Sequence, residues 1–459
     1  MIPKSVSPLF IIFVMLFCGS ICISCEKDPR LEDLPAKLVF SADTVLFDTI
    51  FTGIGSATRH FKVYNPYKET IEIGVISLSG LNTSAYRINV DGVSGRVFNN
   101  IILRGGDSLY IFVEATIDPL DGNLPMVVED SILFSLNGNP QSVKLVAWGQ
   151  DFKILDDEAL QAGILTAEKP YLVYNSITVD SGRVLHIEPG ARLHFHRNSG
   201  LYVAGSVIVS GSYDQPVIFE GSRTETSYRN IPGQWEGIIL MPESRNNRFL
   251  NSRIRNAVNG ILVNTEGEYD VPVLYLANSR IENMTFAGLF TRNTSVYSYN
   301  TIISNCGHHA VAISGGGNYS FYHCTIVNYR NFSARRTPSV IINNDAPVNV
   351  VVANTIIHGS HIRETGFPAN SNPGFDVEFS YCLLPLDEND TREIFQNCIF
   401  DTVPGFLDSD NLNYRLAELS SAIDAGDPAI GRLFPTDYEG KSRLLDKAPD
   451  IGAFERYIE

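Results

Sequence analysis

Asn278-Ser-Arg-Ile-Glu-Asn283 is one of five copies of a six-residue motif that align without gaps. A coil of this kind cannot bury its own apolar face, so neighbouring copies must supply the other wall of a core. The motif therefore predicts a stack of similar coils. The other copies, which give start-to-start intervals of 27, 22, 23 and 31 residues, are Asn251-Ser-Arg-Ile-Arg-Asn256, Asn300-Thr-Ile-Ile-Ser-Asn305, His323-Cys-Thr-Ile-Val-Asn328 and Asn354-Thr-Ile-Ile-His-Gly359.

Each position of the motif predicts one column of the stack. The last position predicts an Asn ladder at a bend, where each amide can bond turn backbone and its neighbour one coil away. A column of small residues is expected at the second position, and His323 stands where the other four copies open with Asn. The fourth position predicts an interior aliphatic column of Ile254, Ile281, Ile303, Ile326 and Ile357, and the ladder comprises Asn256, Asn283, Asn305 and Asn328.

A shorter rhythm begins at Tyr171, where pairs of apolar residues two positions apart alternate with glycine-containing turns. Each pair has its counterpart three pairs further along the chain, at a distance of 22 to 24 residues. Examples are the steps from Ile177 to Leu201 and from Leu185 to Val207. Three short strands per coil are typical of a prism-shaped β-solenoid.

Residues 37–150 alternate apolar and polar residues in short runs separated by turn signals such as Asn65-Pro66 and Asp91-Gly92. Runs of this length and spacing predict an antiparallel β-sandwich of immunoglobulin-like size. Residues 151–170 are expected to form a linker with one short helix.

Two parts of the chain resemble known families. Residues 171–400 resemble the right-handed parallel β-helix superfamily, the fold of pectate lyases and many bacterial surface proteins. The tail is similar to that of "choice-of-anchor Q" β-helix proteins, which implies that residues 401–459 form a C-terminal cap. The tail motifs are Phe406-Leu-Asp408, Asn413-Tyr-Arg-Leu416, Ser421-Ala-Ile-Asp-Ala-Gly-Asp427 and Asp450-Ile-Gly-Ala-Phe-Glu455.

The expected fold is therefore all-β, a right-handed parallel β-helix of three strands per coil preceded by the N-terminal antiparallel β-sandwich. Such motifs specify a fold and leave the activity open.

The N-terminus carries an export signal. Lys4 precedes an apolar run from Leu9 to Cys18 that is too short to span a bilayer. Cys22-Ile-Ser-Cys25 resembles a bacterial lipobox, with Leu replaced at Cys22, and residues 26–28 resemble the acidic export tag of Bacteroidetes surface lipoproteins.

The expected arrangement is a signal peptide over residues 1–24, a palmitate-type lipid on Cys25, and a tether over residues 25–36. The resemblance implies a lipoprotein of the outer membrane, exposed on the cell surface. An ordinary signal peptide cleaved nearby is the alternative.

The composition favours a globular chain with a net charge of −16. An acidic chain without runs of Lys and Arg argues against nucleic acid as a partner. The cysteines beyond Cys25 are expected to be buried thiols rather than disulfides. They are Cys306, Cys324, Cys382 and Cys398.

The strands that lead into the motifs predict an aromatic face. Their outward positions gather Tyr275, Tyr297, Tyr299 and Tyr322 on three adjacent coils. Sugars stack on aromatic faces, so we expect an exposed glycan-binding platform. The alternative is that outward Tyr only favours strand formation.

The long interval after His323 contains an insertion at residues 332–338. Loops extruded from solenoids tend to decorate the binding face. Arg335 and Arg336 in this loop are expected to contact acidic glycans within reach of the tyrosines.

Signals for catalysis or metal binding are weaker. His308 and His309 are candidates for acid–base chemistry, although turn histidines are the simpler interpretation. Glu266, Glu268 and Asp270 share one loop that a cation could occupy, but no metal and no cofactor are expected. The leading hypothesis is non-catalytic binding of a glycan or surface polysaccharide, with a polysaccharide lyase or glycoside hydrolase, or a structural spacer, as alternatives.

Overall fold

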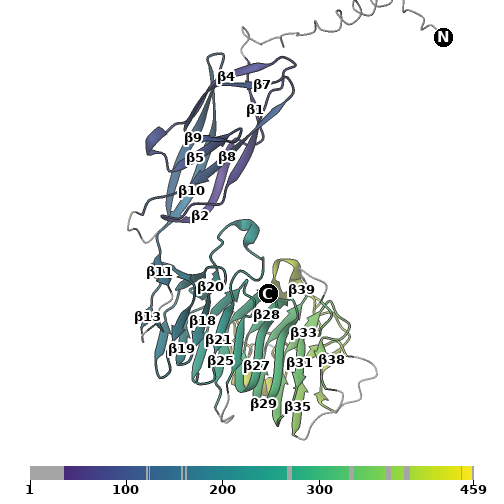
Figure 1. Ribbon diagram of the computed structural model, residues 1–459. Helices are drawn as coiled ribbons and strands as arrows, with labels where there is room; N and C mark the ends of the chain where they lie inside the picture. The colour runs from purple at the N-terminus through teal and green to yellow at the C-terminus, as the bar shows by residue number, and fades with distance from the viewer. Residues whose placement is uncertain are drawn as a thin grey trace, which may run out of the picture. The chain divides into compact units, whose positions relative to one another are not determined.

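The computed structural model describes residues 36–119, 122, 125–156, 159–160, 163–265, 271–329, 335–368, 374–386, 393–445 and 447–456. The chain divides into two compact units. The N-terminal unit comprises residues 1–119 and 125–149, and the C-terminal unit comprises residues 120–124 and 150–459. Strands make up nearly all regular structure in the described residues, which confirms the prediction of an all-β chain (Figure 1).

The N-terminal unit consists of two five-stranded sheets and includes the short 3₁₀ helix η1 (Leu81–Thr83). One sheet has the order β1 (Val39–Phe40), β3 (Arg59–Tyr64), β8 (Ser108–Ala115), β5 (Tyr86–Val90) and β6 (Val93–Gly95). The other has the order β2 (Thr44–Phe51), β10 (Asn139–Gln150), β9 (Met126–Leu136), β4 (Ile71–Leu78) and β7 (Val97–Leu103).

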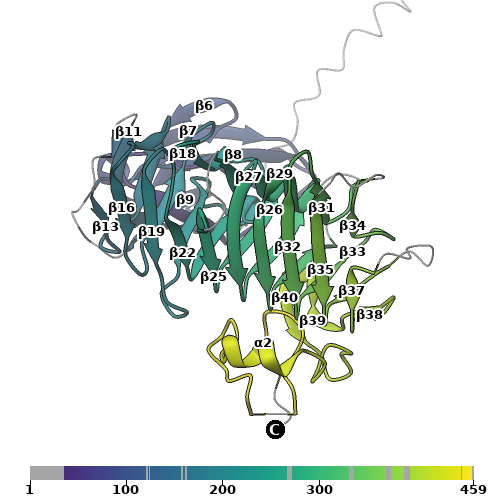
Figure 2. The ribbon, with the colours of Figure 1, turned by 90° about the horizontal axis from the view of Figure 1, so that it is seen from below.

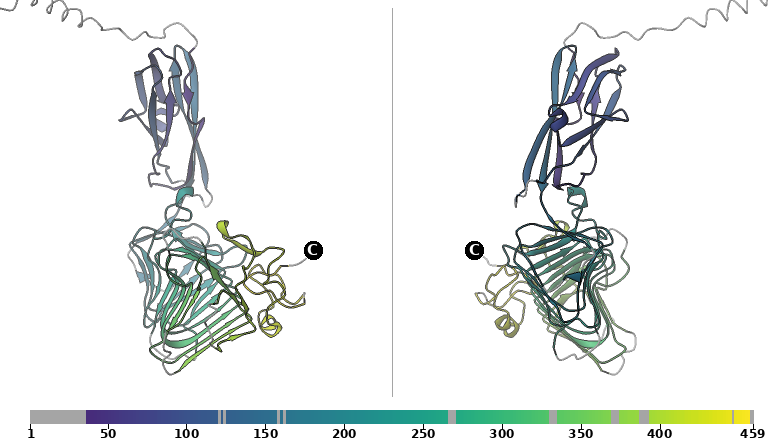
Figure 3. Two further views of the ribbon diagram at one scale, coloured as in Figure 1. Left: turned by 90° about the vertical axis from the view of Figure 1, so that its right-hand side faces the viewer. Right: turned by 60° about the vertical axis from the view of Figure 1, so that its left-hand side comes forward.

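Alternation along these strands builds a single core between the two sheets (Figure 3). On β8, Leu109, Ile111 and Val113 are buried, while the intervening Tyr110 and Phe112 are exposed. This period of two is what a sheet with one solvated face requires.

The C-terminal unit begins with a parallel sheet of eleven strands. Its early members lie three positions apart in the chain, so each strand pairs with its counterpart in the next repeat. The strands are β11 (Lys153–Asp156), β14 (Tyr171–Tyr174), β17 (Arg192–Phe195), β20 (Val217–Gly221), β23 (Ser252–Arg255), β26 (Arg280–Met284), β28 (Ile302–Cys306), β30 (Thr325–Asn328), β33 (Ile356–Gly359), β36 (Leu383–Leu384) and β38 (Ile399–Phe400).

A second parallel sheet of seventeen strands contains two ladders that share the long strands β27 (Ala287–Tyr299) and β29 (His309–Tyr322). The first ladder also includes β12 (Ala159–Leu160), β15 (Ile177–Val179), β18 (Gly200–Val203), β21 (Gly237–Leu240), β24 (Ile261–Asn264), β31 (Val340–Asn343) and β34 (Thr365–Gly366). The second also includes β13 (Ile164–Leu165), β16 (Val184–Ile187), β19 (Ser206–Ser210), β22 (Asn247–Leu250), β25 (Leu274–Ala277), β32 (Val348–Ala353), β35 (Phe375–Ser380) and β37 (Phe395–Gln396).

The predicted Ile column is confirmed. Ile281 pairs with Ile254 on one side and Ile303 on the other, and the register continues through Ile326 to Ile357. All five side chains are buried in one continuous core. The solenoid-like stack therefore buries its aliphatic residues by placing the Ile of each repeat against the Ile of the next.

The Asn ladder at the bend that follows each motif is present for three of its four predicted members, whereas Asn328 has no positive φ and its Oδ1 accepts from the Cys306 backbone N–H at 2.8 Å. The Asn283 Nδ2 atom lies 3.4 Å from Asn256 Oδ1, and Asn305 Nδ2 lies 3.3 Å from Asn283 Oδ1. Asn256, Asn283 and Asn305 have positive φ angles of 65°, 63° and 55°. Asn tolerates this left-handed conformation better than most residues, so it suits a tight bend.

A second polar ladder occupies the bend before each motif. Asn278 and Asn300 share a φ of 47°, and Asn300 Nδ2 donates to Asn278 Oδ1 at 3.0 Å. His323 adopts the same conformation at φ 48°, and its Nε2 lies 3.2 Å from Asn354 Nδ2. The imidazole thus takes the place of an amide in this ladder.

The stack begins earlier than the sequence rhythm suggested. Strands β11, β12 and β13 pair in parallel with β14, β15 and β16, so the segment 151–170 contributes to the first layer. The predicted linker with a short helix is therefore wrong. Acidic residues between the short strands mask the apolar alternation that identifies later repeats.

The C-terminal module, residues 401–456, lies beside the stack rather than beyond its last strands (Figure 2). Its elements are β39 (Phe406–Asp408), η3 (Ser409–Asn411), β40 (Asn413–Leu416) and α2 (Pro428–Leu433), and the stack also carries η2 (Thr226–Tyr228). Leu412, Tyr414 and Ile451 of the module share a core with Ile302 and Val327 of the eleven-stranded sheet. The predicted end cap is therefore a lateral module, because its apolar side matches the outward aliphatic residues of that sheet.

A buried ion pair lies at the centre of this module. The fully buried Arg443 guanidinium lies 2.8 Å from Glu455 Oε2 and donates to Asn300 Oδ1 of the stack at 3.1 Å. Burial raises the pKa of Glu455 to about 8 and that of Asp450 to about 6. A buried charge needs such partners to be tolerated at all.

No disulfide joins the cysteines in the part of the chain that the structure describes. Cys306, Cys324 and Cys382 are buried, and Cys398 is half-buried. These residues are thiols, as expected from the sequence.

Candidate functional site

The predicted alignment of the tyrosine strands is confirmed. One outward row runs from Arg248 through Tyr275 and Tyr297 to Ser320. The adjacent outward row places Tyr299 directly beside Tyr322. The four tyrosines therefore lie on one face, on strands β25, β27 and β29.

The rings of this face pack on one another. The Tyr275 and Tyr297 ring centroids are 5.4 Å apart with planes inclined by only 11°, and Tyr297 lies 5.7 Å from Tyr322. The Arg248 guanidinium lies 6.0 Å from the Tyr275 ring. Because the faces of stacked rings contact each other, this pair presents mainly its ring edges and hydroxyl groups outward.

Phe434 of the C-terminal module covers the other part of the tyrosine face. Its ring lies 4.7 Å from Tyr299, 5.1 Å from Tyr322 and 6.4 Å from Tyr297, and its side chain is only 8% exposed. Burial raises the pKa of Tyr297 to about 12 and that of Tyr299 still further. The expected open platform of four rings is therefore wrong, and a half-buried row around Tyr275 and Tyr297 remains.

Arg335 is not a surface cation. Its guanidinium forms a two-pronged ion pair with Glu364, at 2.6 and 2.8 Å, and its side chain is 1% exposed. It also donates to the carbonyl of Asn328, where β30 ends. Because Tyr322 precedes the start of β30, Arg335 lies at the opposite edge of the eleven-stranded sheet from the tyrosines, and the expected glycan contact is wrong.

Arg336 is exposed beside this ion pair. Residues 332–334 of the predicted loop lie outside the described residues. The described part of the insertion supports the bend at Asn328, and Arg336 follows Arg335 at that edge rather than joining the tyrosine face.

The two candidate histidines lack an acid–base arrangement. His309 Nδ1 lies 2.8 Å from the Pro338 carbonyl oxygen, and burial lowers the pKa of His309. The exposed His308 packs its ring 4.7 Å from Phe286. His309 begins β29 and His308 directly precedes it, whereas Tyr322 ends that strand.

Other predicted sites fall partly outside the structure. Cys25 and the acidic loop of Glu266, Glu268 and Asp270 lie outside the described residues. Within the described ranges, no group of three or more His, Cys, Asp and Glu side chains could hold a metal ion. No helix in those ranges is long and apolar enough to cross a bilayer.

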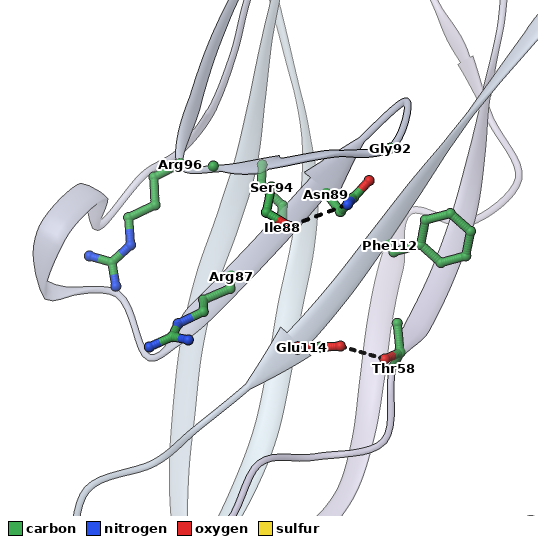
Figure 4. A pocket seen from close by; sticks show the side chains of 10 residues that line it. Thr58, Arg87, Ile88, Asn89, Gly92, Ser94, Arg96, Phe112 and Glu114 are labelled. Carbon is green, nitrogen blue, oxygen red and sulfur yellow. Dashed lines mark hydrogen bonds between the residues drawn. The ribbon is translucent and has the colours of Figure 1, made fainter.

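Sequence reasoning missed a hollow of about 600 Å³ in the N-terminal unit (Figure 4). It lies against the solvated face of the sheet that contains β8, β5 and β6. Its walls include Arg87, Asn89, Arg96, Phe112 and Glu114. The signal was present in β8, whose outward positions carry an aromatic pair and an acid.

Comparisons with known proteins provide no family. No family model matches the chain, and no curated protein matches it. A family 123 glycoside hydrolase from Clostridium perfringens shares 8% identity over 24% of this chain, at a TM-score of 0.19. This chain spans 25% of the length of that enzyme.

Two small β domains give similar results. The periplasmic chaperone SfaE shares 11% identity over 25% of this chain and 57% of its own, at a TM-score of 0.16. The seventh PapD-like domain of human CEP192 shares 12% identity over 28% of this chain and 96% of its own, at a TM-score of 0.17. At such TM-scores the likeness supports neither a fold family nor a function.

Proposed function

We propose that this protein is a lipid-anchored surface protein that binds a glycan without cleaving it. The observation that carries the proposal is the half-exposed row of Arg248, Tyr275 and Tyr297 on adjacent strands. The row offers hydroxyl groups and one cation at the spacing of neighbouring strands, about 4.8 Å. Sugar hydroxyls both donate to and accept from phenolic oxygens, so an extended glycan can run along the row.

The parallel stack gives this row a rigid support. We propose that the stack is a right-handed β-helix of three strands per coil. The pairing of strands three positions apart, such as β15 with β18 and β16 with β19, supports this architecture. Parallel crossover connections are right-handed in nearly all known sheets. We also propose, from the pairing of its strands, that the N-terminal unit is an immunoglobulin-like sandwich.

The proposal is tested with the double variant Tyr275→Ala and Tyr297→Ala. Screening the chain without residues 1–25 on a glycan array should identify a ligand, and the double variant should bind it roughly tenfold more weakly. The matched control is Tyr202→Ala, which removes a half-buried outward tyrosine from β18. Equal binding by the wild type and the double variant would exclude the tyrosine row as the site.

A structural spacer is the second candidate. Phe434 occupies much of the aromatic face, which favours a role for the tyrosines in seating the C-terminal module. An array without ligands, combined with a fully folded double variant, would favour the spacer. Release of shortened products from a bound glycan would favour the lyase or hydrolase alternative.

A further inference from the structure

The hollow in the N-terminal unit is built by three neighbouring strands of one sheet. β5 provides Arg87 and Asn89, β8 provides Phe112 and Glu114, and β6 provides Ser94 at the edge. The register places Phe112 beside Asn89 and Glu114 beside Arg87. Because these residues occupy outward positions, they line the hollow without disturbing the core.

A tight turn closes one side of the hollow. Asp91 and Gly92 join β5 to β6 with φ angles of 51° and 83°. Two consecutive positive φ angles are the mark of the hairpin turn that Asp-Gly favours. The hairpin holds Asn89 against Ser94, with Asn89 Nδ2 donating to Ser94 Oγ at 3.3 Å.

Positive charge gathers on one side of the hollow. The exposed Arg87 forms no hydrogen bond or ion pair with any described residue, and Arg96 donates to the Leu81 carbonyl oxygen at 3.0 Å. Figure 4 shows both guanidinium groups on the same side, with the Phe112 ring on the other. Two planar, fork-shaped donors on one side of a hollow suit a carboxylate, even in a chain with a net charge of −16.

The remaining wall is aromatic and accepts hydrogen bonds. Phe112 is 39% exposed, and its ring lies 6.0 Å from Tyr110 and 5.8 Å from His60. Glu114 Oε1 accepts from Thr58 Oγ1 at 2.6 Å, which leaves acceptor capacity on that carboxylate. Asn89 Oδ1 is buried without a hydrogen-bond partner in the described residues, and only its Nδ2 atom is paired, with Ser94.

We propose that this hollow binds a short saccharide that carries a carboxylate, that is, a uronate-containing oligosaccharide. The carboxylate pairs with Arg87 and Arg96, the hydroxyl groups donate to Glu114, and a C–H face of the sugar packs on Phe112. A hollow of about 600 Å³ has the size of a small-ligand site. The proposal does not depend on the tyrosine row of the other unit.

The test uses the chain without residues 1–25 and the probe α-1,4-trigalacturonic acid, with its fully methyl-esterified form as the neutral counterpart. Isothermal titration calorimetry at low salt should show that the acid binds roughly tenfold more tightly than the ester, because charge-assisted bonds are lost with the charge. Arg87→Ala should weaken binding of the acid by about tenfold or more, and Phe112→Ala should weaken both forms.

The matched control is Arg104→Ala, which removes an equally exposed arginine of the same unit outside the hollow. It should bind the acid as the wild type does. The proposal is overturned if the acid does not bind, if the ester binds equally well, or if Arg104→Ala loses as much affinity as Arg87→Ala.

The variant of Tyr275 and Tyr297 separates this proposal from the proposed function of the stack. It should retain full affinity for trigalacturonic acid. Loss of acid binding in that variant, together with retention in Arg87→Ala, would assign the acidic ligand to the stack and overturn the site in the hollow.

Discussion

Individual residues of the six-residue motif stabilise the stack in two different ways. Ile at the fourth position excludes water, and each of its five copies is buried against the neighbouring copies of the column. Asn at the bends satisfies a backbone requirement, because its φ angle is positive and its amide bonds the next coil. Both roles follow from side-chain chemistry alone, so both were predictable from the sequence.

Ile303→Ala should destabilise the protein by about 2–5 kcal/mol, because neighbouring coils cannot refill the cavity. Chemical denaturation monitored by circular dichroism measures this loss. Ile164→Ala is the matched control, since Ile164 of the same stack is largely exposed and should change stability by about 0.5 kcal/mol or less. Equal effects of the two substitutions would contradict the interior column.

His323→Asn should make stability less sensitive to acid. Burial holds the pKa of His323 well below its ordinary value of 6.5. The folded state therefore binds fewer protons than the unfolded state, so stability falls as the pH drops below about 6.5. The Tm of the wild type should fall more steeply than that of the variant between pH 7 and pH 5.

The exposed His186 provides the control for this experiment. His186→Asn should leave the pH profile of the wild type unchanged. A variant at residue 323 that loses as much Tm as the wild type on acidification would show that this imidazole is not the sensitive group.

At the scale of secondary-structure elements, the register of the strands was predictable from the sequence. The burial of the tyrosine face by another segment was not. The strand before each motif follows from counting back two residues, and the observed pairing of Tyr275 with Tyr297 agrees. Phe434 is more than a hundred residues away in the chain, just after the six-residue helix α2 as its C-cap residue. No periodicity links it to the tyrosines, so only the folded structure reveals that it covers them.

Phe434→Ala should uncover the tyrosine face. Burial raises the pKa of Tyr297 to about 12 and that of Tyr299 further, so removal of the covering ring should bring both pKa values down towards 10. Ultraviolet difference spectroscopy during a pH titration follows the phenolate directly. The neighbouring Leu433 is 69% exposed, so Leu433→Ala should leave the titration unchanged.

For the whole molecule, the sequence predicted an all-β chain and a parallel stack, because repeats can be recognised from their regular spacing. It did not predict the hollow of the N-terminal unit, because Arg87, Asn89 and Phe112 come from strands that are adjacent in the sheet but distant in the chain. Nor did it predict the burial of Arg335, because Glu364 comes from the following repeat. A site built from residues on neighbouring strands can be recognised only once the pairing register of those strands is known.

Cys25→Ala should move the protein from the membrane fraction to the soluble fraction and abolish labelling by fatty-acid analogues. A lipid chain that inserts into the bilayer provides the anchor, and without the thiol no chain can be attached. Cys22→Ala is the matched control and should remain membrane-bound. Unchanged membrane association of the Cys25 variant would contradict the lipoprotein prediction.

The lateral position of the C-terminal module has a mechanical consequence. Coils of a solenoid contact only their neighbours, so a pulling force would normally peel them away one at a time. Here Asn300 and Asn354 both hydrogen-bond the module, at Thr436 and Asp427, although two motif intervals separate them. The module therefore connects several coils, and these coils must rupture together. Single-molecule stretching should record one large force peak for them.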